Sequence, residues 1–173
     1  KILSPDLQNK QFLLLCLSSG LFFASFNMIV PELPNYLTSL GGAEYKGLII
    51  SLFAITAAIS RPFSGKLADL VGRKPIMVFG AAASAICCAL YPFVGGLFAF
   101  FILRLVHGLS TGFKPTGDTA YLADIINSKN RGEALGVLGM SGSAGMAAGP
   151  AIGSLIAINY GLDIMFALSS LTA

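Results

Sequence analysis

The sequence predicts an all-α membrane protein with six membrane helices, the last of them shortened. Of its 173 residues, 55% are hydrophobic and only 11% are charged, and apolar runs recur along the chain. A soluble domain carries about 25% charged residues, and a globule with far less would expose apolar patches large enough to aggregate. The net charge of +3 and the lack of a basic run argue against nucleic-acid binding.

A helix that crosses a bilayer needs roughly 20 mostly apolar residues, each of which adds about 1.5 Å to its length. The predicted spans are compared with this length. The first run, Phe12–Val30, contains no charge, and we expect it to continue past Pro31 and Pro34 to about Leu37 with a bend. The other spans are Gly47–Leu70, Pro75–Val94, Leu97–Asp124, Ala134–Ile158 and Leu162–Ala173. Short connections make sequential helices antiparallel.

The sixth span has room for only part of a crossing. Twelve residues cover about 18 Å, whereas the hydrocarbon core is about 30 Å thick. The chain also begins with Lys1 rather than Met. Both observations predict that residues 1–173 are a piece of a longer protein.

Basic residues are distributed unequally between the two sets of helix ends. One set carries eight of them and the other carries only Lys46. The eight are Lys1, Lys10, Arg61, Lys66, Arg73, Lys74, Lys129 and Arg131. Since Lys and Arg favour the cytoplasmic side, we expect a multi-pass protein of the plasma (inner) membrane with a cytoplasmic N-terminus.

Few residues suggest catalysis or metal binding. Cys16, Cys87 and Cys88 lie in apolar runs and are interpreted as small buried hydrophobes. With His107 as the only histidine, neither a zinc site nor a cofactor is predicted. A membrane enzyme needs convergent nucleophiles, bases or ligands, and a channel needs a pore-lining ring or a selectivity loop; the sequence indicates neither.

The segment GKLADLVGRKP, residues 65–75, is the most specific motif in the chain. Asp69 and Arg73 are close enough in sequence to pair, and Gly72 between them allows a tight turn. A cytoplasmic loop with paired charges would explain the charges alone. The full pattern, however, resembles the signature loop between the second and third helices of the major facilitator superfamily. The matching residues are Gly65, Leu67, Ala68, Asp69, Gly72, Arg73 and Lys74, and Leu70 departs from the pattern.

Four further segments resemble the same family in the same order. VPELPNYL (30–37) is similar to the proline pair that ends its first helix, and RLVHGLSTG (104–112) to the R-x-x-x-G-x-x-x-G of its fourth. NRGEALG (130–136) resembles the loop before the fifth helix, and GMAAGPAIG (145–153) resembles the fifth helix of the drug:proton antiporter branch. The resemblance runs from about Phe12 to the end of the chain.

The resemblance implies a twelve-helix fold of two six-helix halves around a central cavity, of which residues 1–173 would be the N-terminal transmembrane half-domain. It implies a secondary transporter that moves small solutes by alternating access. Proton-coupled export is the interpretation that the resemblance favours. A proton-coupled importer of a sugar or metabolite is the alternative. The implied partners are a small-molecule solute, protons, the lipid bilayer and the missing C-terminal half.

The fourth span carries a polar stripe. At 100° per residue, five of its polar side chains fall within an arc of about 80°. They are Arg104, His107, Thr111, Lys114 and Asp118. A charge at the bilayer centre costs about 2.5–3.5 kcal/mol, so we expect the stripe to face a water-filled cavity or polar partners rather than lipid. We expect it to turn inward, toward the first span or the interface between the two halves.

Four of the five members of the stripe also have a structural alternative. Lys114 and Asp118 are one turn apart and can pair, or Lys114 can extend to water with Asp118 near the cytoplasmic surface. Arg104 can be a hydrogen-bonding hub, and His107 an interhelical donor rather than a proton relay. Pro115 is expected to kink the helix.

The remaining candidates lie outside this stripe. Asn27 can bind substrate or a neighbouring helix, and Glu32 is either a solvated rim residue or a proton acceptor. The substrate or proton candidates are therefore Arg104, Lys114, Asp118, Asn27 and Glu32. Asp124 resembles the acidic partner of the signature arginine, which gives a predicted gating network of Gly65, Asp69, Gly72, Arg73 and Asp124. The spacing of small residues predicts close helix packing at Gly145, Gly149, Pro150 and Gly153. This is either ordinary tight packing within one half or, as the resemblance implies, a part in sealing the cavity on one side.

Overall fold

In the computed structural model, residues 5–173 are described, with side chains from Leu7 onward. The predicted all-α architecture is confirmed over this range, and four short 3₁₀ helices (η) precede α1 or lie between some of the α-helices. In chain order the elements are η1 (Pro5–Gln8), α1 (Lys10–Ile29), α2 (Leu33–Ser39), η2 (Ala43–Tyr45), α3 (Leu48–Val71), α4 (Arg73–Leu90), η3 (Tyr91–Phe93), α5 (Leu97–Ile125), η4 (Ser128–Asn130), α6 (Arg131–Tyr160) and α7 (Leu162–Thr172).

The helices match the predicted spans closely. Within the described part of the chain, five stretches are long and apolar enough to cross a membrane, and α7 is a shorter apolar helix. The first span is α1 and α2 in succession, with the predicted bend at residues 30–32. Gly72 has a φ of 98°, which L side chains rarely adopt, and it makes the predicted tight turn between α3 and α4.

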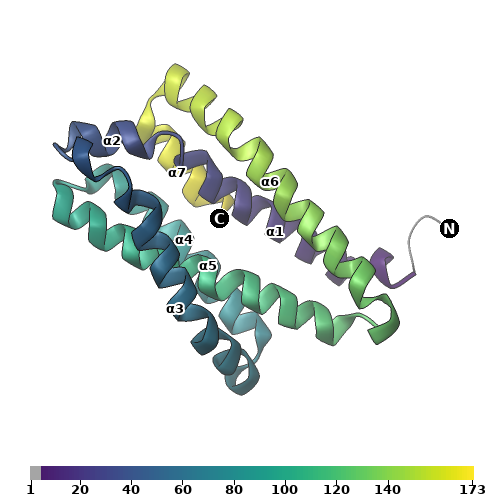
Figure 1. The fold of residues 1–173 in the computed structure, drawn as a ribbon. Helices are drawn as coiled ribbons and strands as arrows, with labels where there is room; N and C mark the ends of the chain where they lie inside the picture. The colour runs from purple at the N-terminus through teal and green to yellow at the C-terminus, as the bar shows by residue number, and fades with distance from the viewer. Residues whose placement is uncertain (1–4) are drawn as a thin grey trace.

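The six spans are arranged in two groups (Figure 1). α1 packs chiefly on α6 and also on α7, whereas α5 packs on both α3 and α4. In the view of Figure 1, α3 and α6 lie at the two sides, with α1 and α5 between them and α4 behind. The face that α1, α3, α5 and α6 share is the one that carries the site described below.

Glycines set how closely these helices approach. A Cβ atom added at Gly149 of α6 would lie 2.7 Å from the carbonyl oxygen of Ala24 in α1, and Gly145 and Gly153 meet the α1 backbone in the same way. Gly108 of α5 plays the corresponding part against α3, where a Cβ would meet the Phe53 carbonyl. Backbone-to-backbone contact of this kind requires glycine.

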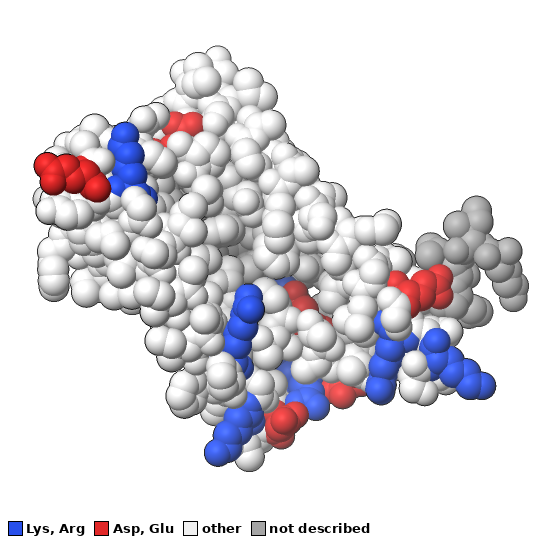
Figure 2. Space-filling view, viewed as in Figure 1, with Lys and Arg blue, Asp and Glu red and all other residues white. Residues whose placement is uncertain are grey.

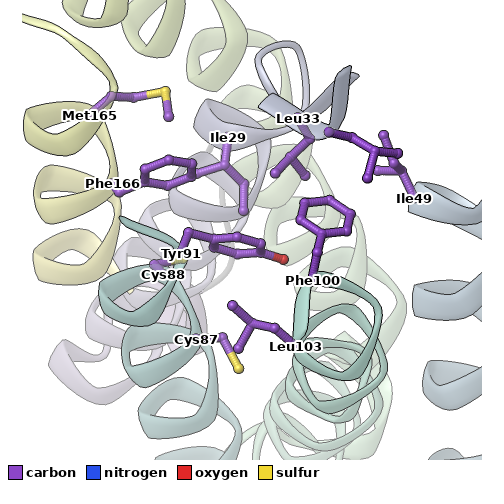
Figure 3. Close-up of a cluster of buried hydrophobic side chains, with 11 residues drawn as sticks. Ile29, Leu33, Ile49, Cys87, Cys88, Tyr91, Phe100, Leu103, Met165 and Phe166 are labelled. Carbon is purple, nitrogen blue, oxygen red and sulfur yellow. The ribbon is translucent and has the colours of Figure 1, made fainter. Parts of the chain in front are cut away.

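A hydrophobic cluster joins α1, α2, the start of α3, α4, η3, α5 and α7 at one end of the bundle (Figure 3). Tyr91 lies in the middle of it, fully buried, with its ring stacked on Phe166 at a centroid distance of 5.2 Å. The Tyr36 hydroxyl donates to the Tyr91 carbonyl oxygen at 2.6 Å. The cluster anchors the short helix α7 to the bundle, although α7 is only 11 residues long.

The charged side chains gather at the ends of the bundle (Figure 2). In Figure 2, several Lys and Arg side chains lie at the end where α3 meets α4 and α5 meets α6, and a few charged side chains lie further in, on the hollowed surface between α3 and α6. Lys1, which was counted among the basic residues of that end, lies outside the described residues.

Candidate functional site

Arg104 of α5 is a hydrogen-bonding hub. Its side chain is buried, with 1% of the residue exposed. Nε donates to the Ile49 carbonyl oxygen at 2.9 Å, and Nη1 donates to the Tyr91 hydroxyl at 3.0 Å. The guanidinium also lies 4.8 Å from the centre of the Phe53 ring, an arrangement that stabilises a cation. These contacts tie α5 to the start of α3 and to η3.

His107 lies one turn further along α5 and is fully buried. Its Nε2 is 3.3 Å from the Ser84 hydroxyl, and its Nδ1 is 3.4 Å from the Tyr91 hydroxyl. Phe26 and Phe53 approach the ring edge-on. The ring therefore links α5 to α4 and η3, which is the geometry of the interhelical alternative.

Lys114 and Asp118 form a buried ion pair. Lys114 Nζ donates to Oδ1 at 2.9 Å and to Oδ2 at 2.8 Å, and both side chains are 2% exposed. The ammonium lies 5.5 Å from the centre of the Phe22 ring of α1. The pair thus turns toward the first span, as predicted, and the alternative in which Lys114 extends to water is wrong.

A cavity of about 500 Å³ opens on the face shared by α1, α3, α5 and α6. Its volume lies within the range of about 300–1,000 Å³ that is usual for small-molecule sites. The lining residues are Phe23, Phe26, Asn27, Val30, Ile50, Phe53, Ala54, Ala57, Ala58, Arg61, Arg104, Thr111 and Met146. Figure 2 looks onto this hollowed side of the molecule, between α3 and α6.

The polar side chains of the cavity include two of the substrate candidates. Asn27 lines the cavity while its amide donates to the Phe23 carbonyl of its own helix at 2.8 Å. Arg104 and Thr111 also reach the lining. Most of the wall is apolar, with Phe26 and Phe53 stacked at 4.5 Å. Such a wall suits a solute with an aromatic or aliphatic body and few polar groups.

A second hollow, of about 350 Å³, adjoins the cavity and reaches Asp118. It shares Phe23 and Met146 with the first. Ser19 of α1, Pro115 and Thr119 of α5, and α6 side chains between residues 135 and 143 complete its lining. The carboxylate of the ion pair therefore lies at the edge of the same face as the cavity.

Glu32 lies apart from both hollows. It is half-buried, and its Oε1 accepts a hydrogen bond from Ser154 Oγ of α6 at 2.7 Å. It lines neither of the two hollows. The structure therefore brings together Asn27, Arg104 and the Lys114–Asp118 pair, and leaves Glu32 at the rim.

Arg73 joins the charged ends of three helices. Its Nη1 donates to Asp69 and its Nε donates to Asp124 Oδ2 at 3.1 Å, so both predicted contacts are present. Gly72 makes the turn that brings Arg73 back toward Asp69. Gly65, one of the predicted network residues, has only the Thr116 methyl of α5 near the position of a Cβ, at 4.0 Å.

Sequence reasoning missed two kinds of contact. It assigned Arg61 to the charged cytoplasmic end, whereas the residue lines the cavity. The signal was its position inside α3, ten residues before Val71. It also missed Tyr91 and Ser84 as partners of the α5 stripe, because no local spacing relates them to that helix.

Comparison with known proteins gives consistent matches. Residues 15–173 match the sequence profile of the Major Facilitator Superfamily. The multi-drug resistance efflux pump PmrA of Streptococcus pneumoniae serotype 4 is 38% identical over 150 residues, which cover 84% of this chain and 37% of that protein. The multidrug resistance protein MdtG of Rahnella sp. (strain Y9602) is 37% identical over 153 residues, covering 85% and 37% respectively.

One solved structure shows the same fold. The crystal structure of the human organic anion transporter MFSD10 (TETRAN) matches with a TM-score of 0.78 at 23% identity, over 98% of this chain and 47% of that one. The chain spans 37% of the length of the two bacterial relatives.

Proposed function

The chain belongs to the major facilitator superfamily, and we propose that it forms the N-terminal half of a transporter that exports small amphipathic solutes in exchange for protons. Membership in the family makes it part of a transporter rather than an enzyme. The direction is supported by the names of its relatives PmrA and MdtG, which are efflux and multidrug resistance proteins. The proposed location is the plasma membrane, with the N-terminus in the cytoplasm.

One observation carries this proposal: a buried ion pair borders a mostly apolar cavity. Asp118 is 2% exposed and is neutralised by Lys114, yet it reaches a hollow that adjoins the cavity. A buried carboxylate needs either a cationic partner or a proton. Asp118 is therefore suited to exchange its bond with Lys114 for a proton when the cavity changes.

Alternating access would change the shape of the cavity and so the surroundings of Asp118. The two halves of such transporters rock around a central site near the middle of the membrane. In the proposed cycle, solute binding and protonation of Asp118 compete, because the cavity and the hollow that reaches Asp118 adjoin and share Phe23 and Met146. Proton entry from one side and solute release on that side are then linked.

Two other parts of the chain would serve the cycle. The contacts of Arg73 with Asp69 and Asp124 hold the cytoplasmic ends of α3, α4 and α5 together, which favours the outward-facing state. Gly72 makes the tight turn at that junction, whereas Gly65 makes no close approach that requires glycine. Gly145, Gly149, Pro150 and Gly153 allow α6 to seal one side of the cavity against α1.

The test uses the complete transporter in proteoliposomes that enclose a pH indicator. A panel of amphipathic solutes is added, and solute-driven proton movement is recorded. Asp118→Asn is expected to abolish proton movement while substrate binding, measured separately, persists. Asp163→Asn, which changes an exposed carboxylate at the start of α7, serves as the matched control.

The outcomes separate the alternatives. Proton and solute moving in opposite directions support export, whereas movement in the same direction supports the proton-coupled importer. Full proton movement in Asp118→Asn would exclude Asp118 as the coupling residue.

A further inference from the structure

Arg61 is a charged residue of the cavity face that has no role in the contacts described so far. It lies on α3, is exposed, and lines the cavity of about 500 Å³. It also lines a hollow of about 540 Å³ next to it, together with Thr116 and Thr119 of α5. Among residues 7–173, whose side chains are described, the Arg61 guanidinium makes no hydrogen bond or ion pair.

The depth of Arg61 in the membrane indicates that its exposed side chain faces water rather than lipid. It precedes Val71, the last residue of α3, by ten positions, which is about 15 Å along the helix axis. The α3 segment before it, residues 52–59, contains no charged residue. A charged side chain at this depth has a high free energy when it faces lipid, and such side chains face the bundle interior or a water-filled cavity instead. Arg61 meets this condition, because it lines the cavity.

The other charges near the cavity are already engaged. Arg104 is buried and its Nε and Nη1 donate to Ile49 and Tyr91. Lys114 is neutralised by Asp118. Of the charged residues that line these hollows in the described part of the chain, Arg61 alone is exposed. The cavity face therefore presents one available positive charge beside an aromatic wall.

We propose that Arg61 binds an anionic group of the transported solute, so that the substrate class is amphipathic organic anions. The aromatic or aliphatic body of the solute lies against Phe26 and Phe53, and its carboxylate, sulfonate or phosphate meets the guanidinium. A guanidinium matches such groups with two parallel hydrogen bonds. This inference rests on the proposed transport function and names the solutes that the same cavity takes.

The experiment measures binding to the complete transporter in lipid nanodiscs with three probes of one shape. They are naphthalene-2-sulfonate, the neutral naphthalene-2-sulfonamide and the cationic 2-naphthylmethylammonium. The wild type is expected to bind the sulfonate at least about tenfold more tightly than the sulfonamide, which is about 1.4 kcal/mol. Arg61→Gln should remove this difference and leave sulfonamide binding unchanged, and Arg61→Lys should retain part of it.

Lys66→Gln is the matched control, because it removes a positive charge from the same helix at an exposed position that lines none of these hollows. It should leave the preference for the sulfonate intact. If Arg61→Gln weakened the binding of all three probes equally, the inference would be overturned. That result is expected if Arg61 pairs with a carboxylate of the other half and does not contact the solute. A wild type without preference for the sulfonate would also overturn it, while solute-driven proton movement would test the transport function independently.

Discussion

The ion pair between Lys114 and Asp118 is expensive to bury and is held by its own geometry. Both side chains are 2% exposed, and the ammonium contacts both carboxylate oxygens. Desolvation of two charges offsets much of their attraction, so replacing a buried pair by apolar residues is often neutral or stabilising. Removing one partner leaves an uncompensated buried charge and costs about 3–5 kcal/mol. The pair is therefore explained better by function than by stability.

This asymmetry gives a prediction for stability. Asp118→Ala should lower the unfolding free energy by about 3–5 kcal/mol, because Lys114 then stays buried without a counter-charge. The double variant Lys114→Met with Asp118→Leu should be clearly more stable than Asp118→Ala. Thermal unfolding of the purified transporter in one detergent compares the two. A double variant that is less stable than Asp118→Ala would show that the pair is held by contacts beyond its own charges.

The residue contacts that the sequence could predict are those set by local spacing. Lys114 and Asp118 are one turn apart on one helix, and Asp69 and Arg73 flank a glycine turn. Asp124 was placed by resemblance to the family's motif. The contact of Arg104 with the Ile49 carbonyl was out of reach, because it depends on how α3 and α5 pack and not on spacing along either helix.

At the scale of elements, the predicted helix ends differ from the observed ones by a few residues. α4 begins at Arg73 rather than at the predicted Pro75, since Gly72 ends α3 with a positive φ and the new helix starts directly after it. A proline is accepted within the first helical turn, where N–H groups have no partner in the helix. α6 begins at Arg131 rather than Ala134, with Glu133 in its first turn, where a negative charge is favourable.

The contact between α1 and α6 depends on individual glycines and makes the second prediction. In Gly149→Leu, the side chain would displace the Ala24 carbonyl, 2.7 Å from the position of the Cβ, and separate the helices. We expect a loss of stability of about 1–3 kcal/mol, as in other overpacked sites, and loss of transport. Unfolding temperature and solute flux measure the two effects.

Gly139→Ala is the matched control on the same helix. No atom lies within 4 Å of its Cβ position, and alanine is favoured over glycine in a helix interior by about 1 kcal/mol. This variant should be as stable as the wild type or slightly more so. If both variants behaved alike, helix propensity rather than close packing would govern α6.

The Arg73 network leads to a third prediction, which concerns conformation rather than stability. Asp69 and Asp124 have side chains that are 72% and 51% exposed, and exposed ion pairs contribute about 0.2–1 kcal/mol. Asp124→Asn should therefore leave the unfolding temperature nearly unchanged. If the network favours the outward-facing state, the variant should shift the population toward the inward-facing state, by up to about fivefold.

Cysteine labelling can detect that shift. Thr119→Cys introduces a thiol at an exposed position in the hollow beside Pro115. Its labelling from the cytoplasmic side should be faster when combined with Asp124→Asn, but not with Asp163→Asn. Equal rates in both combinations would exclude the network as a determinant of the conformational equilibrium.

At the scale of the whole molecule, composition predicted the class of fold, and the local motifs predicted the family. Low charge content and recurring apolar runs were enough to predict an all-α membrane fold, which the helices and the family match confirm. The cavity was not predictable in the same way, since its lining comes from α1, α3, α5 and α6. Only the stripe on α5 indicated which side of the bundle it would occupy.

The last prediction concerns orientation, which follows from the distribution of basic residues. Lys129 and Arg131 flank the junction of α5 and α6, whereas η2 lies at the opposite end with Lys46 as its basic neighbour. Because Lys and Arg are retained in the cytoplasm, Ser128→Cys should be protected from a membrane-impermeant maleimide in intact cells. Ala43→Cys should be labelled under the same conditions.

In inside-out vesicles the expected labelling is reversed: Ser128→Cys should be labelled and Ala43→Cys protected. Because Ser128 and Ala43 are both exposed, this reversal shows that protection in either preparation comes from the membrane and not from burial in the protein. The native Cys16, Cys87 and Cys88 are buried, so the parent protein should give little background in either preparation. Labelling of Ser128→Cys in intact cells would place the junction of α5 and α6 outside. It would also move the Arg73 network to the external surface, where the same contacts would favour the inward-facing state instead.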